Sequence, residues 1–216
     1  MNLDPLARQF QERFDAKSAA RERALVAARR AIRSSANAIR AIHRLDRETA
    51  HRLMDEARAA IEDGVGAVRD HPDVAFAGFL QDAQKEYVEA RITEAVIDDG
   101  EFPTPDELGV QLAPYLNGMA EAVGEARRHI LDLLRKGEVA RSEAMLRSME
   151  DIYSVLVSMD YPDAITGNLR RSTDVARSIM EKTRGDLSMS IVQRDLRDAL
   201  ERHARQFGGG DPGARA

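Results

Sequence analysis

Apolar residues recur every three or four positions along most of this 216-residue chain, which is the spacing of amphipathic helices. The pattern predicts helices over residues 3–44, 47–68, 72–98, 112–136, 139–158 and 165–207. The last is expected to be broken or bent near Gly185, and the stretch DDGEFPTPDELG is expected to be a loop with one short turn. No strand pattern and no repeat occurs. We therefore expect an all-α fold, a single-domain bundle of six or seven antiparallel helices over residues 1–207.

The composition fits a globular helical domain without disulfides or membrane segments. Hydrophobic residues make up 43% of the chain, enough for a core, and the absence of cysteine excludes disulfides and thiolate metal sites. The charged N-terminus and the lack of any apolar run of 18 residues indicate a soluble, cytoplasmic protein. Residues 208–216, GGGDPGARA, contain too little apolar surface to fold, and we expect a disordered tail there.

Two pairs of glutamates have helical spacing, Glu86 with Glu89 and Glu121 with Glu125. Each pair places two carboxylates on one helix face. Four acids converging between two packed helices would repel one another unless a cation lay among them, so they form a candidate site for Mg²⁺ or Mn²⁺. From the residues alone, a solvated acidic surface is the more common meaning of such pairs. Gly118, in the same stripe as the second pair, predicts a close approach by another backbone or a ligand.

The first predicted helix carries a basic ridge opposite its apolar stripe. Its members are Arg23, Arg29, Arg30, Arg33, Arg40, Arg44 and Arg47. No acid occurs between Arg23 and Arg44, and at 1.5 Å per residue the ridge is roughly 30 Å long. A stripe of one sign attracts phosphate, although an ordinary solvated face is an equally good explanation.

The candidate nucleic-acid-binding residues are Arg23, Arg30, Arg33, Arg40 and Arg44, followed by Arg170, Arg171 and Arg184. The chain has few aromatic residues, so binding should be electrostatic and weakly sequence-specific. A net charge of −5 argues against a generic nucleic-acid binder. The chain contains no cysteine nucleophile, no GxSxG or P-loop motif and no HExxH motif, which leaves the carboxylates as the main candidates for catalysis.

Three segments resemble the Translin/Trax family, in particular its prokaryotic, Trax-like branch. They are QKEYVEARI, PYLNGMAEAVGEARRHILDLLRKG and LRRSTDVARSIMEKTRGDLSMSIVQRDLRDALE. The resemblance implies a translin-like helical fold that assembles into a hollow octamer. It also implies that Trax-type subunits act as Mg²⁺-dependent endoribonucleases on single-stranded RNA.

The resemblance also assigns roles to the glutamates. Glu86 and Glu89 match the glutamates of the EYVEA motif, and Glu125 matches the glutamate that closes the second motif. Glu121 stands where the family's nuclease subunits typically carry an aspartate, and Pro114 replaces an acid before the Tyr-Leu pair. We expect all four glutamates to be catalytic and metal-binding, with Mg²⁺ or Mn²⁺ as cofactor.

Two other functions remain open at this point. The chain could be a non-catalytic, translin-type oligomer that holds single-stranded RNA or DNA without cutting it. It could also be a helical scaffold in which the methionine-rich helix 139–158 forms a subunit interface.

Overall fold

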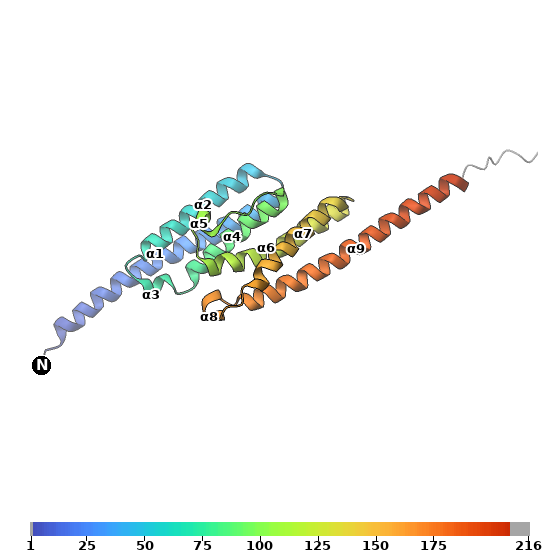
Figure 1. The fold of residues 1–216 in the computed structure, drawn as a ribbon. Helices are drawn as coiled ribbons and strands as arrows, with labels where there is room; N and C mark the ends of the chain where they lie inside the picture. Colours follow the sequence, from blue (N-terminus) through green and yellow to red (C-terminus); the bar gives the residue numbers. More distant parts are fainter. Residues whose placement is uncertain (1, 208–216) are drawn as a thin grey trace, which may run out of the picture.

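The computed structural model describes residues 2–207, and the predicted disordered tail lies outside them. Nine helices and no strand occur in this range (Figure 1). The helices are α1 (Asp4–His43), α2 (Arg47–Ala67), α3 (Pro72–Ala75), α4 (Phe79–Asp98), α5 (Pro105–Leu108), α6 (Leu112–Arg135), α7 (Val139–Ser158), α8 (Asp163–Thr166) and α9 (Leu169–Phe207). The predicted all-α class is confirmed. The helix count exceeds the prediction because α3, α5 and α8 are single turns.

The long helices pack in a chain of neighbours, with α4 and α6 in the middle. Helix α1 packs against α2 and α4, α4 packs against α6, and α6 packs against α7 and α9 (Figure 1). A tight turn joins α1 to α2, and the Asp46 carboxylate caps α2 by accepting a hydrogen bond from the backbone N–H of Thr49. Helices α4 and α6, which carry the glutamate pairs, are therefore covered on both flanks.

Two breaks differ from the sequence prediction. The predicted helix over residues 72–98 is interrupted at Gly78, whose φ of +96° is incompatible with a helix. The last helix begins only at Leu169, because Gly167 and Asn168 both adopt positive φ. The expected break at Gly185 does not occur, since α9 runs through that position without interruption.

The core draws on α1, α2, α4, α6, α7 and the first half of α9. Small alanines on the inner face of α1 let its neighbours approach closely, while larger side chains such as Tyr87, Ile130 and Ile152 fill the space between the later helices. Met145 and Met149 of α7 are buried in this core, with 5% and 0% exposure. A subunit interface on this helix would therefore have to use its other residues.

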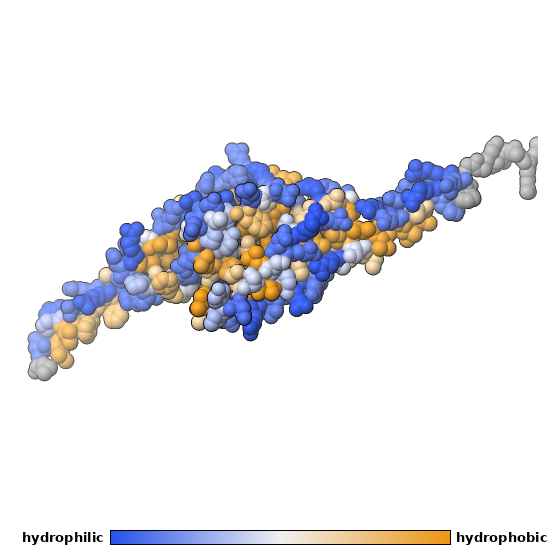
Figure 2. All heavy atoms as spheres, viewed as in Figure 1, coloured by the Kyte–Doolittle hydropathy of each residue, from blue (hydrophilic) through white to orange (hydrophobic). Residues whose placement is uncertain are grey.

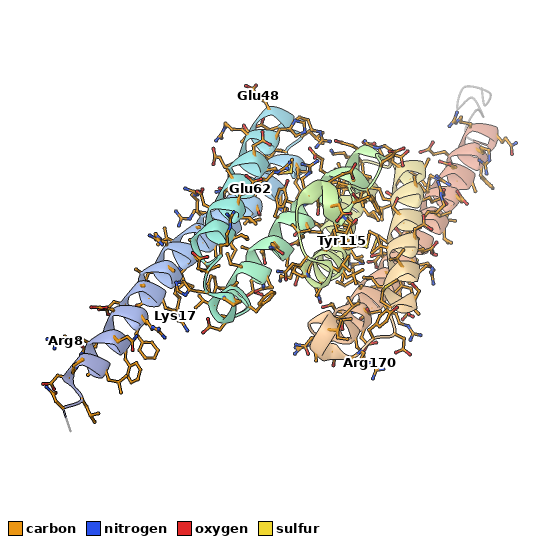
Figure 3. The ribbon with its side chains drawn as sticks, turned by 60° about the vertical axis from the view of Figure 1, so that its left-hand side comes forward. Arg8, Lys17, Glu48, Glu62, Tyr115 and Arg170 are labelled. Atoms are coloured by element: carbon orange, nitrogen blue, oxygen red, sulfur yellow. The ribbon has the colours of Figure 1, made fainter. Side chains whose placement is uncertain are left out.

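Both ends of the molecule project beyond the core. The N-terminal part of α1, around Arg8 and Lys17, and the C-terminal half of α9 extend in opposite directions (Figures 1 and 3). Each projection carries an exposed apolar stripe, visible in orange in Figure 2. The α1 stripe consists of Leu3, Leu6, Phe10 and Phe14, and the α9 stripe of Met189, Val192, Leu196 and Leu200. Within residues 2–207, no helix is both long enough and apolar enough to cross a membrane.

Candidate active site

The site begins with an unusually close contact between α4 and α6 at Gly118. A Cβ atom at this position would lie 2.5 Å from the carbonyl oxygen of Lys85 and 2.8 Å from the Cβ of Val88. Only glycine fits there, so the predicted close approach at Gly118 is confirmed, and its partner is the backbone of α4. The contact lies one turn before Glu121 on α6 and directly before Glu86 on α4.

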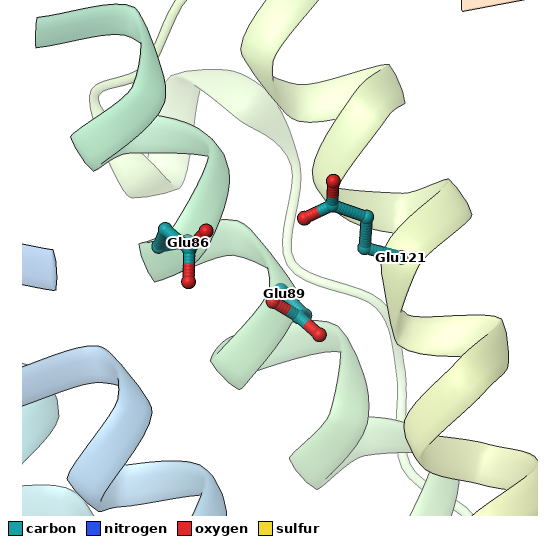
Figure 4. Close-up of side chains that lie close together, drawn as sticks. All are labelled: Glu86, Glu89 and Glu121. Atoms are coloured by element: carbon teal, nitrogen blue, oxygen red, sulfur yellow. The ribbon is translucent and has the colours of Figure 1, made fainter. Parts of the chain in front are cut away.

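Three of the four predicted glutamates meet beside this contact. Glu86, Glu89 and Glu121 each offer a carboxylate oxygen, and these oxygens all lie within 4.8 Å of one another. Figure 4 shows Glu121 of α6 projecting toward the two glutamates of α4. All three are partly buried. We call these three residues the acid cluster.

Lys85 supplies a positive charge to the acid cluster. Its Nζ donates a hydrogen bond of 2.7 Å to Glu121 Oε1 and lies 3.4 Å from Glu86 Oε1. Burial alone would lower the pKa of Lys85, but the hydrogen bond and charge of Glu121, together with the charge of Glu86, raise it above its usual value. The ammonium is therefore firmly charged and offsets part of the repulsion between the carboxylates.

Glu89 is the most perturbed acid of the cluster. Burial and the negative charges of Glu86, Glu121 and Glu125 raise its pKa to about 8, and the opposing charge of Lys85 is too weak to cancel this effect. At neutral pH Glu89 is thus mostly protonated. A divalent cation would favour its ionised form, because it adds positive charge where like charges now dominate.

Glu125 lies outside the acid cluster because other side chains hold it. Its Oε2 accepts a 2.5 Å hydrogen bond from Nε2 of His43, the last residue of α1, and Arg128 Nη1 lies 3.6 Å from the same oxygen. The bond from His43 is the main cause of a lowered Glu125 pKa, although burial opposes it. The carboxylate is therefore ionised at neutral pH, and the imidazole is the donor. Arg128 thus pairs with Glu125.

A pocket of about 430 Å³ lies against these acids. Glu89, Glu121 and Glu125 line one side, and Arg171 and Ser172 at the start of α9 line another. Arg171 is exposed, and its guanidinium makes no ion pair or side-chain hydrogen bond with the described residues. The pocket therefore combines carboxylates with a free cation, a combination suited to a phosphate group held near a metal ion.

The donor set fits a hard divalent cation. All three members of the acid cluster contribute carboxylate oxygens, the ligands that Mg²⁺ and Mn²⁺ prefer, and no imidazole belongs to the group. The ammonium of Lys85 already contacts two of these carboxylates, which shows that the position accepts positive charge. Glu86, Glu89 and Glu121 are the residues that would hold the ion.

Most of the basic ridge lies exposed along α1, but Arg47 is half-buried at the start of α2, and neighbouring helices neutralise part of the ridge. Arg30 pairs with Asp63 of α2 at 2.5 Å, and Arg47 pairs with Asp98 of α4. Arg40 bonds only the amide oxygen of Asn37. Arg23, Arg29, Arg33 and Arg44 take part in no ion pair or side-chain hydrogen bond among residues 2–207 and remain the free cations of the ridge. Arg44 directly follows His43, the residue that contacts Glu125, in the sequence.

Sequence reasoning missed two residues of this site, Lys85 and His43. Lys85 is adjacent to Glu86 in sequence, and adjacent helical residues do not share a face, so spacing gave no reason to place it in the cluster. His43 contacts Glu125 across 82 positions of sequence. Only the packing of α1 against the central helices brings those two residues together.

Comparisons with known proteins show which family the chain resembles in sequence and fold. No family model matches the chain. The uncharacterized protein MJ0175 of Methanocaldococcus jannaschii is 32% identical over 188 residues, which is 86% of this chain and 83% of that protein. The crystal structure of AfC3PO, a Translin/Trax-type protein, is 34% identical and superposes with a TM-score of 0.80, covering 87% of this chain and 98% of that one.

The chain belongs to the Translin/Trax-like family. A structure of AfC3PO in complex with duplex RNA agrees equally well, with 35% identity, a TM-score of 0.80 and coverage of 87% and 97%. Apo-NeC3PO, at 23% identity and a TM-score of 0.71, shows the same fold. In this Translin/Trax-like chain, the EYVEA motif lies on α4 and the second glutamate motif on α6, so the two helices that meet at Gly118 carry both.

Proposed function

We propose that this protein is an endoribonuclease that uses Mg²⁺ or Mn²⁺ to cut single-stranded RNA and works as a homo-oligomer. The observation that carries the proposal is the acid cluster. Three carboxylates from two helices lie within 4.8 Å of one another, and the pKa of Glu89 is raised to about 8, so the site favours an added cation. Membership of the Translin/Trax-like family supports the same reading.

A divalent cation at this position would acidify a water molecule and offset the charge that develops on the phosphate during hydrolysis. Glu86, Glu89 and Glu121 would hold it. Lys85, freed from Glu121, would be available to a phosphate oxygen from a neighbouring pocket, which also has Glu121 and Ser172 in its lining. Arg171 faces the acids from α9 and would hold the substrate phosphate against them.

The proposed RNA path combines the pocket with the basic ridge. Arg33 and Arg40 lie exposed on α1, and the exposed Arg44 directly follows His43, the residue that contacts Glu125. Contacts of this kind follow the phosphate backbone and do not select bases, so binding should weaken steeply as salt rises. AfC3PO has been solved with duplex RNA, so duplex as well as single-stranded substrates belong in the test.

The decisive experiment is cleavage of labelled RNA in Mg²⁺ or in chelator. We expect Mg²⁺-dependent cutting by the wild type and its loss in Glu86→Gln and Glu121→Gln. Asp132→Asn is the matched control, because Asp132 is an exposed acid of α6 that pairs only with Arg135. Cutting that survives both glutamine substitutions, in proteins that remain folded, would show that the acid cluster is not the active site.

The alternative is a translin-type protein that binds single-stranded RNA or DNA without cutting it. Its specific support is the ion pair of Lys85 with Glu121, because an ammonium in the cluster competes with a metal ion. A stable, Mg²⁺-independent complex with RNA and no cleavage would favour this function. Failure to bind or cut would leave a helical scaffold.

The homo-oligomer follows from the two apolar stripes as well as from the family. Leu3, Leu6, Phe10 and Phe14 follow one another at intervals of three, four and four residues, and the α9 stripe has the same intervals. Apolar faces of this size are unfavourable in water and mark contact surfaces. An octamer is the size that the family resemblance suggests, and light scattering would measure it.

A further inference from the structure

His43 occupies a position that packing alone does not explain. Its side chain is 7% exposed, and its Nδ1 is buried without a hydrogen-bond partner among residues 2–207. A buried polar atom without a partner costs free energy, whereas a leucine of similar size would fill the same space without that cost. Within the described part of the chain, the one hydrogen bond of the ring joins Nε2 to Glu125 at 2.5 Å.

The frame around His43 is rigid. His43 ends α1, and the backbone immediately after it turns through hydrogen bonds from Arg44 N to Arg40 O and from Asp46 N to Ala41 O. On its other side lies the ring of His129, with 6.0 Å between the two ring centroids. The side chain of His43 is 7% exposed and that of Glu125 is 24% exposed, so Glu125 has more room to move than the imidazole. We expect Glu125 to adapt to His43 rather than the reverse.

The two carboxylate oxygens of Glu125 have different surroundings. Oε2 is taken by His43 and approached by Arg128, while Oε1 has no hydrogen-bond partner in the described part of the chain. Glu125 also lines the pocket that Glu89 and Glu121 line, and it is close enough to raise the pKa of Glu89. The carboxylate is thus next to the acid cluster but is not free to join it.

We propose that His43 is a positioning residue that holds Glu125 outside the acid cluster, with Oε1 directed at the pocket to orient the attacking water. This role rests on the proposed nuclease function. In this proposal, three of the four glutamates hold a cation and the fourth, Glu125, faces the water. His43, a residue of α1, keeps Glu125 apart from the other three.

The test compares two substitutions of His43 with one of His129. His43→Leu keeps the volume and removes the donor, whereas His43→Gln keeps an N–H that can reach Glu125. His129→Leu is the matched control, because His129 is an equally buried histidine of the same cluster of rings that does not contact Glu125. The readouts are kcat and KM for single-stranded RNA, Mn²⁺ affinity by electron paramagnetic resonance, and a crystal structure of each His43 variant.

We expect His43→Leu to lower kcat by about 10- to 100-fold with an unchanged KM, the range found when a supporting hydrogen bond is removed. Mn²⁺ affinity should not weaken, because Glu125 is not needed to hold the ion. His43→Gln should recover most of kcat, and His129→Leu should keep it. In the crystals, Glu125 should leave its place in His43→Leu and keep it in His43→Gln.

Three results would overturn the proposal. They are wild-type kcat in His43→Leu, equal losses in His43→Leu and His129→Leu, and a fall in Mn²⁺ affinity that matches the fall in kcat. If the wild type does not cut RNA, the proposed nuclease function is refuted, whatever the His43 variants do. The Mn²⁺ affinities and the position of Glu125 in the two variant crystals still decide whether His43 holds that carboxylate outside the cluster.

Discussion

The contact at Gly118 makes a strong prediction for Gly118→Ala. The new Cβ would lie 2.5 Å from the carbonyl oxygen of Lys85, whereas ordinary contact begins at 3.4 Å, so α4 and α6 would have to separate by about 0.9 Å. The obstacle is backbone and cannot rotate away. Overpacking of this kind costs about 1–3 kcal/mol, against a gain of about 1 kcal/mol from replacing a helical glycine. We therefore expect a net loss of up to about 2 kcal/mol of unfolding free energy.

The same displacement would reach the acid cluster. Glu121 lies one turn after Gly118, and Glu86 follows Lys85, so the helices would separate where the carboxylates meet. A shift near 1 Å can cost about 100-fold in rate, and we expect RNA cleavage by Gly118→Ala to fall by about 10- to 100-fold.

Urea unfolding at a fixed protein concentration measures the stability term. Gly124→Ala is the matched control on the same helix, because its Cβ would meet only the Cδ1 of Ile179 at 3.9 Å. That variant should gain about 0.5–1 kcal/mol from helix propensity. If Gly118→Ala is stabilised as much as Gly124→Ala, the reasoning about the close contact is refuted.

Three further predictions concern pH, assembly and the start of α9. In chelator, the pKa of Glu89 is about 8 in the folded state, against an ordinary value of 4.5, so between these pH values the folded state keeps a proton that the unfolded state loses. The free energy of unfolding should therefore fall as pH rises from about 4.5 to 8. Urea titrations of Glu89→Gln should show a flatter dependence on pH. Phe14→Asp places a charge in the α1 stripe and should lower the mass measured by light scattering, while Arg8→Asp, a charge change elsewhere on that helix, should not. Asn117→Ala removes the donor to the buried Thr166 carbonyl and the acceptor of the Ser172 hydroxyl, so it should cost about 1–3 kcal/mol in urea unfolding and expose the α8 segment to protease.

Much of the fold could be predicted from hydrophobic spacing. The bounds of α1, α2, α6 and α7 agree with the predicted ranges to within one residue at each end, because proline, glycine or charged turns mark the ends of a strong periodic pattern. The break at Gly78 was not predicted, because the apolar pattern continues on both sides of this residue. A glycine's φ is set by the packing around it, and the same residue type at Gly185 stays helical.

Only part of the candidate site could be predicted from the sequence. Helical spacing predicted which acids share a helix face, and Gly118 predicted a close approach. Which of the acids come together depends on how α4 crosses α6 and on where α1 ends. Those are tertiary relations, and they place Lys85 inside the acid cluster and Glu125 outside it.

Lys85 has a consequence for how this protein depends on its environment. Many small metal sites are assembled only when the ion arrives, so the chain cannot fold without it. Here a side chain of the same helix already supplies a positive charge between Glu86 and Glu121. Under the proposed function, folding would then not depend on the metal supply. A cell short of divalent ions would hold a reserve of folded, inactive protein that becomes active when the ions return.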